Sequence, residues 1–124
     1  MFEIKIITSF AAAHCLRHFR GKCESLHGHN WKVEVLLRSP VLDKAGLVVD
    51  FKLVKDATKE LLEELDHKYL NELPAFSEEN PSSENIARFL FHELTKKLNQ
   101  GPVMVHMVTA WESEDSCASY FEQP

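Results

Sequence analysis

The residues best suited to chemistry are two histidines separated by a single glycine, His27 and His29. They stand directly before a run that alternates apolar and polar residues, 31–37. Side chains at positions i and i+2 of a β-strand point to the same face of the sheet. If this stretch is a strand, both imidazoles converge on one point and form half of a metal site.

The third ligand that the pattern suggests is His14, at the end of the first apolar run. If the two strands pair antiparallel, His14 comes level with the His27 and His29 pair. Three histidines with one open position are typical of catalytic zinc, whereas structural zinc sites usually close with four protein ligands. Iron or nickel would also accept imidazole ligands, so the metal identity stays open between these and zinc.

A cysteine, Cys23, lies four residues before His27. A cation nearby lowers the pKa of a thiol, and the resulting thiolate can act as a general base. The alternative is a buried, inert thiol, because free cysteine is among the most buried residue types.

Several short motifs follow one another over essentially the whole chain: Ala-Ala-His at 12–14, Cys-x-x-x-His-Gly-His at 23–29, Leu-Asp-His at 65–67, Pro-Ser-Ser-Glu-Asn at 81–85 and Trp-Glu-Ser at 111–113. Together, and in this order, they resemble the 6-pyruvoyltetrahydropterin synthase / 6-carboxytetrahydropterin synthase family. The resemblance implies a zinc ion on His14, His27 and His29, with Cys23 as a catalytic base.

The resemblance also assigns roles further along the chain. Asp66 and His67 match a proton relay, although a solvent-facing helix terminus is the simpler alternative for this pair. Glu112 matches a glutamate that anchors the pterin and also joins the proton relay as a catalytic residue. A carboxylate suits the two neighbouring N–H donors of a 2-amino-4-oxo pyrimidine. Ser82 and Ser83 match hydroxyl residues near the pterin, and helix capping would explain them equally well.

Glu24 adds a second signature, because it directly follows Cys23 and gives Glu-x-x-His-Gly-His. Family branches with a glutamate there resemble folate-pathway enzymes that form 6-hydroxymethyl-7,8-dihydropterin. The alternative for Glu24 is a surface loop residue.

A small basic cluster, residues 17–22, lies between His14 and Cys23. Its arginines, Arg17 and Arg20, are candidates to receive substrate phosphates, and a solvated loop is the alternative.

Composition limits the possible classes. The chain has 124 residues, 44% of them hydrophobic and 27% charged, which fits one globular domain spanning 1–124. A formal net charge of −5 argues against general nucleic-acid binding. No apolar run approaches the ~20 residues needed to span a bilayer, the N-terminus lacks a signal-peptide pattern, and three cysteines make no disulfide framework, so we expect a cytoplasmic protein without a membrane partner.

Periodicity predicts strands over 2–10, 31–38, 103–112 and 117–121. It predicts helices that start after Asp50 and at Ser82, the first of them ending in 66–71. The order ββααββ favours an α+β fold with two helices on one face of the sheet. The resemblance implies a four-stranded antiparallel sheet of the tunnelling-fold type. It also implies homo-oligomers, trimeric barrels or dimers of trimers, with the site near a subunit interface.

The sequence therefore predicts a zinc-dependent carbon–oxygen lyase acting on 7,8-dihydroneopterin triphosphate. The preferred product is 6-carboxy-5,6,7,8-tetrahydropterin, which the resemblance links to queuosine-type synthesis. The alternatives are 6-pyruvoyltetrahydropterin, the 6-hydroxymethyl product through Glu24, and a zinc- or pterin-binding oligomeric module without activity.

Overall fold

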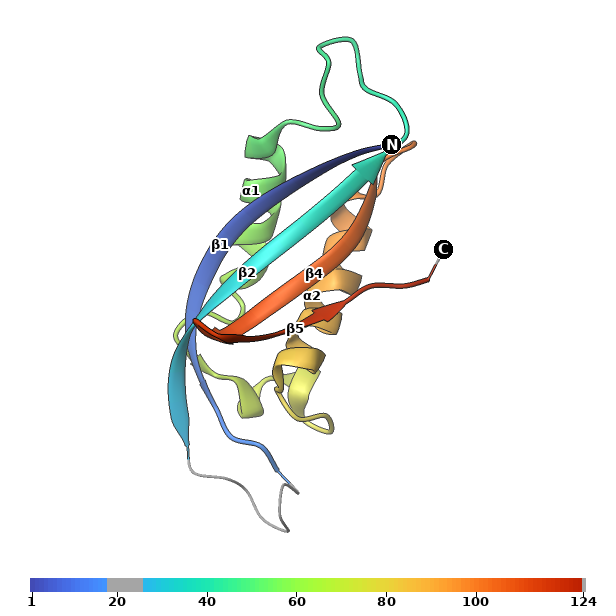
Figure 1. The fold of residues 1–124 in the computed structure, drawn as a ribbon. Helices are drawn as coiled ribbons and strands as arrows, with labels where there is room; N and C mark the ends of the chain where they lie inside the picture. The colour runs from blue at the N-terminus through green and yellow to red at the C-terminus, as the bar shows by residue number, and fades with distance from the viewer. Residues whose placement is uncertain (18–25, 124) are drawn as a thin grey trace.

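The structure is a computed structural model that describes residues 1–17 and 26–123. Its strands and α-helices follow in the order β1 (Phe2–His14), β2 (His27–Ser39), α1 (Phe51–Leu62), β3 (Lys68–Tyr69), α2 (Ser83–Leu98), β4 (Met104–Ser113) and β5 (Ser116–Tyr120). Two short 3-10 helices, Leu70–Glu72 and Pro74–Phe76, connect β3 to α2. Figure 1 shows the long strands β1, β2 and β4 side by side in front of the two α-helices.

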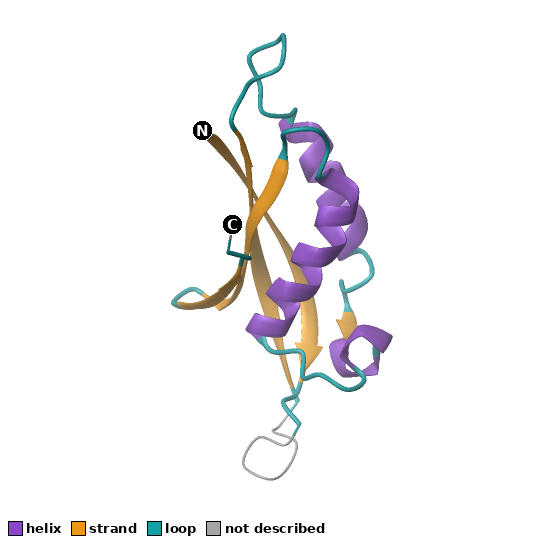
Figure 2. Ribbon diagram, turned by 90° about the vertical axis from the view of Figure 1, so that its right-hand side faces the viewer, coloured by secondary structure: helices purple, strands orange, loops and turns teal. Residues whose placement is uncertain are grey.

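The strands form one sheet in the order β3-β1-β2-β4-β5. The α+β class and the two helices are as predicted, and Figure 2 shows both helices on one side of the sheet. The prediction of a four-stranded antiparallel sheet is wrong, because β3 adds a fifth strand that runs parallel to β1 and makes the sheet mixed.

The chain turn after α1 explains the extra strand. The helix ends at Leu62 rather than continuing into 66–71. Asp66 Oδ1 accepts the Ala11 N–H at 2.8 Å, and the His67 N–H donates to the Ala11 carbonyl at 2.6 Å. His67 takes a φ of 59°, in the left-handed region that a non-glycine residue seldom adopts. These contacts lay β3 along the edge of β1.

Both helices begin where the sequence predicts. Asp50 caps α1 by accepting the Lys52 N–H at 2.9 Å, and the Ser82 hydroxyl caps α2 by accepting the Asn85 N–H at 3.1 Å. Each cap satisfies a backbone donor that the first helical turn leaves without a partner.

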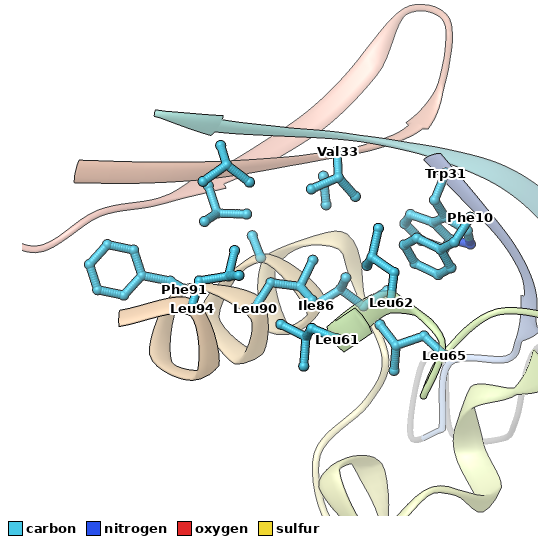
Figure 3. Close-up of a cluster of buried hydrophobic side chains, with 14 of the residues drawn as sticks. Phe10, Trp31, Val33, Leu61, Leu62, Leu65, Ile86, Leu90, Phe91 and Leu94 are labelled. Carbon is cyan, nitrogen blue, oxygen red and sulfur yellow. The ribbon is translucent and has the colours of Figure 1, made fainter. Parts of the chain in front are cut away.

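The core lies between the sheet and the helices. Alternate residues of β2, namely Trp31, Val33, Val35 and Leu37, are fully buried on the face that the helices cover. Leu90 and Leu94 of α2 pack into the same cluster, one helical turn apart (Figure 3). None of the described helices is both long and apolar enough to cross a bilayer.

The first two strands extend further than the alternating runs suggested. β2 starts at His27, not Trp31, and β1 continues through Ala12 to His14. Their antiparallel register pairs His14 with His27 and Ala12 with His29. This end of the hairpin lies at the bottom of Figure 1, far from the N-terminus.

Candidate active site

Three histidines converge where β1 ends and β2 begins. The imidazole centroids are 4.6 Å apart for His14 and His27, 4.5 Å for His27 and His29, and 5.2 Å for His14 and His29. The strand geometry explains this, since His27 and His29 share one face and His14 is the cross-strand partner of His27. The structure therefore brings together the three residues that the sequence offered as metal ligands.

Glu112 joins these histidines from β4. Its Oε1 lies 3.0 Å from His29 Nε2 and 3.4 Å from His14 Nε2. One candidate ligand atom from each of the four residues lies within 4.8 Å of the other three. The buried indole of Trp31 closes the floor, with its ring centroid 5.1 Å from that of His14 and 5.6 Å from that of His29.

His14 is held in one orientation. Its side chain is 1% exposed, and its Nδ1 lies 2.7 Å from the Pro81 carbonyl oxygen. A carbonyl only accepts, so Nδ1 carries the proton and Nε2 keeps its lone pair. That buried Nε2 has no hydrogen-bond partner among the described residues and points toward the cluster. A buried, unpaired acceptor is costly unless a further group satisfies it.

The nitrogen atoms of the other two imidazoles lie so close together that a cation between them would relieve their repulsion. His27 Nδ1 lies 2.5 Å from His29 Nε2, and the same Nε2 also faces Glu112. One proton cannot serve both contacts. Burial lowers the pKa of His29, and His27 and His14 lower it further against the opposing pull of Glu112. Neutral imidazoles and one carboxylate form a donor set that zinc accepts, so the residues present fit this metal.

Asp66 and His67 meet beside this cluster. Asp66 Oδ2 lies 3.0 Å from His67 Nδ1, and the hydrogen bond from the Ala11 N–H, followed by the contact with His67, lowers the pKa of Asp66. His67 and His29 both line an open hollow of about 530 Å³. The His67 side chain is 81% exposed, which leaves it accessible to a ligand in that hollow.

The remaining predicted site residues either make contacts outside the histidine cluster or lie outside the described part of the chain. The Ser82 hydroxyl is used as the α2 cap, and Ser83 is buried. The Arg17 guanidinium donates to the carbonyls of Phe76 and Glu79, the latter at 3.0 Å. Three predicted residues lie outside the described part of the chain: Cys23, Glu24 and Arg20.

Two asparagines that hold the backbone near the site, Asn71 and Asn80, were not identified from the sequence. Asn71 accepts the Cys15 N–H at 2.9 Å and donates to the Cys15 carbonyl at 2.8 Å, and Asn80 makes the same pair of bonds with Arg17 at 2.7 Å each. Neither resembles a catalytic motif. The available signal was Asn80 directly before Pro81, a dipeptide typical of turns.

A sequence profile of the family described as 6-pyruvoyl tetrahydropterin synthase matches residues 3–123. The chain therefore belongs to this family, and the resemblance inferred from the motifs is confirmed. Among the solved structures, that of Caenorhabditis elegans 6-pyruvoyl tetrahydropterin synthase superposes with a TM-score of 0.84 at 26% identity, covering 98% of this chain and 96% of that one.

Relatives with two different names match over most of the chain. A Synechocystis protein named 6-carboxy-5,6,7,8-tetrahydropterin synthase is 38% identical over 118 residues, covering 91% of this chain and 88% of the relative. A Pyrococcus furiosus protein named dihydroneopterin monophosphate aldolase is 34% identical over 107 residues, covering 86% of each. Family membership thus leaves more than one reaction open.

Proposed function

We propose that this protein is a zinc-dependent 6-carboxy-5,6,7,8-tetrahydropterin synthase that acts on 7,8-dihydroneopterin triphosphate. The observation that carries the proposal is the convergence of His14, His27 and His29, with an unpaired lone pair on the buried His14 Nε2. The Synechocystis relative supports this choice of product.

In this proposal the three histidines hold one zinc ion per chain. When bound, zinc polarises a side-chain oxygen of the substrate and makes the adjacent C–H bond easier to deprotonate. The buried Trp31, whose ring contacts those of His14 and His29, would exclude water from one side of the histidine cluster, and electrostatic interactions are stronger where water is excluded.

Glu112 is proposed to bind the pterin through its carboxylate, which can accept two neighbouring N–H donors. Its Oε1 lies beside His29 and His14, so this carboxylate is also close enough to the proposed metal ligands to take part in metal binding. To reach a pyrimidine edge, it must direct an oxygen away from the histidines. Ser82 and Ser83 are proposed to lie near the pterin, at the start of α2.

Proton transfer is proposed to divide between Cys23 and the pair Asp66 and His67. Asp66 is held ionised by the Ala11 N–H and faces His67 Nδ1, so its carboxylate can accept a hydrogen bond from that nitrogen and orient the imidazole. Arg17 and Arg20 are proposed to receive the triphosphate. For Arg17 this requires its guanidinium to turn from the Phe76 and Glu79 carbonyls.

We also propose a cytoplasmic homo-oligomer, a trimer or a dimer of trimers, with each site near a subunit interface. The helices cover one face of the sheet, and the edge strand β3 has only two residues (Figure 2). The opposite edge, β5, leaves backbone groups for a further strand. A second chain could cover these edges and the side of the site that His67 leaves exposed.

The test is incubation of purified protein with 7,8-dihydroneopterin triphosphate and identification of the products by mass. We expect the 6-carboxy product from the wild type, none from His27→Ala, and full activity from His92→Ala, a matched histidine on the exposed side of α2. The absence of any pterin product from zinc-loaded wild type would favour the binding-module alternative.

A second candidate reaction is supported by the Pyrococcus furiosus relative, which is named as an aldolase. Glu24 next to Cys23 is the residue proposed for side-chain cleavage to the 6-hydroxymethyl product. Cys23→Ala should then abolish the carboxy product and retain the hydroxymethyl product, while Glu24→Ala shows the opposite. Equal loss of both products in both variants would reduce Glu24 to a supporting residue. 6-Pyruvoyltetrahydropterin is the third product that the mass analysis would distinguish.

A further inference from the structure

The orientation of His14 depends on a carbonyl 67 residues away in the sequence. Pro81 presents its oxygen to His14 Nδ1 at 2.7 Å, from the loop just before α2. This contact determines the ring nitrogen that carries the proton, and so leaves the lone pair of Nε2 directed into the histidine cluster. The position of the Pro81 carbonyl is therefore part of the geometry of the site.

Asn80 fixes this loop to the end of the first strand. Its Oδ1 accepts the Arg17 N–H and its Nδ2 donates to the Arg17 carbonyl, both at 2.7 Å. A side-chain amide has the same donor and acceptor as a peptide group. The pair of bonds therefore imitates one step of an antiparallel ladder, three residues after His14.

The loop is also fastened from the helix side. Asn85 Nδ2 donates to the Asn80 carbonyl at 2.8 Å, and Ser82 caps α2. Pro81 lies between these two anchors, and its ring fixes φ. With both neighbours held, the Pro81 carbonyl stays directed toward His14 Nδ1, which lies 2.7 Å from its oxygen.

We infer that Asn80 is a positioning residue of the metal centre, which holds the Pro81 carbonyl against His14 and so keeps the His14 Nε2 lone pair aimed at the ion. The inference rests on the metal site of the proposed function. Asn80 is not one of the proposed metal ligands, and the contacts that define its role are those with Arg17 and Asn85. Partners that orient a ligating histidine typically change metal affinity by about 10- to 100-fold.

The experiment measures zinc affinity of the metal-free protein by competition with a chelator, in the wild type, Asn80→Ala and Asn99→Ala. Asn99 is the matched control, because its Oδ1 accepts the Val105 N–H at 2.8 Å at the opposite end of α2. We expect Asn80→Ala to bind zinc about tenfold more weakly or worse, and Asn99→Ala to keep the wild-type affinity.

The ¹⁵N chemical shifts of His14 in the metal-free protein provide a second readout. We expect Nδ1 protonated in the wild type and a mixture of tautomers in Asn80→Ala. If Asn80→Ala does not fold, Asn85→Ala reaches the same loop from the helix side and should show the same loss of affinity.

Wild-type zinc affinity in the folded Asn80 variant, or equal weakening in Asn80→Ala and Asn99→Ala, would overturn the inference and leave the proposed metal centre intact. Failure of the wild type itself to bind zinc would instead refute the metal centre, and this inference with it.

Discussion

The inward face of β2 has two halves that differ in chemistry although they lie on one strand. Toward its C-terminal end the face carries Val33, Val35 and Leu37, which are completely buried. Toward its N-terminal end the same alternation places His27 and His29, and His29 retains 24% of its side-chain exposure. Trp31 separates the two halves and contacts both, stacking on Phe10 and meeting the edge of His29.

The difference follows from what lies over each half. α2 begins at Ser83 and packs Leu90 and Leu94 against the aliphatic half (Figure 3). The histidine half faces the loop before that helix, which offers His14 the carbonyl of Pro81. One strand therefore serves stability where a helix covers it and offers ligands where none does. Substitutions in one half should leave the property of the other half unchanged.

The largest effect is expected in the histidine half. His27→Ala should remove nearly all zinc, because it deletes one of three proposed ligands, while the unfolding free energy of the metal-free protein changes by only about 1 kcal/mol. Elemental analysis and chemical denaturation of the metal-free form measure the two. Stoichiometric zinc in the folded variant would contradict the three-histidine assignment.

The aliphatic half should show the reverse pattern. Leu90→Ala creates a cavity in a fully buried position and should lower the unfolding free energy by about 2–5 kcal/mol. Zinc stoichiometry in the folded protein should stay at the wild-type value. A parallel loss of zinc would show that the two halves are coupled.

Glu112→Gln separates pterin binding from zinc binding within the site at the histidine half. The amide offers one acceptor and places an NH₂ group against a pterin donor, which should weaken pterin binding by about 1–3 kcal/mol. Zinc binding should weaken less, since the three imidazoles remain. Calorimetry with a dihydropterin and with zinc measures both, and unchanged pterin affinity would remove Glu112 from the pterin site.

Ser82→Ala tests the start of α2, which lies between the part of β2 that this helix covers and the histidine half. Loss of the α2 cap should lower the unfolding free energy by about 1 kcal/mol. Denaturation gives this value, and calorimetry with the same dihydropterin tests the proposed binding role separately. A variant as stable as the wild type would show that the cap contributes nothing.

The smallest effect is expected at Asp66, which fastens β3 beside the site. Its pKa is lowered in the folded protein, mainly by the Ala11 N–H, so the ionised carboxylate stabilises the fold above its ordinary pKa of about 3.9 and this contribution disappears as the pH falls through the lowered value. Asp66→Asn keeps an acceptor oxygen but no charge. Denaturation should show the variant less stable than the wild type at pH 7 and a smaller difference at pH 3; a difference that does not change with pH would contradict this account.

Much of the fold could be predicted because its signals are local. The period-two alternation in β2, the apolar stripes of α1 and α2, and the caps Asp50 and Ser82 each depend on neighbours within a few residues. The same local logic placed His27 and His29 on one face. His14 required only the assumption that the first two strands pair.

Other features were decided by contacts between distant segments. The strand β3 exists because Asp66 and His67 bind both backbone groups of Ala11, 55 residues away in the case of Asp66, and no periodicity in a two-residue strand could indicate it. The approach of Glu112 to His29, and of Pro81 to His14, likewise depends on how β4 and the loop before α2 fold back onto the first hairpin. The sequence by itself determined the residue types and their spacing along each strand, which set the candidate ligands. Only the tertiary structure decided where these ligands meet and which nitrogen of His14 carries the proton. Both depend on contacts between segments that are far apart in the chain, and no periodic pattern in the sequence indicates such contacts.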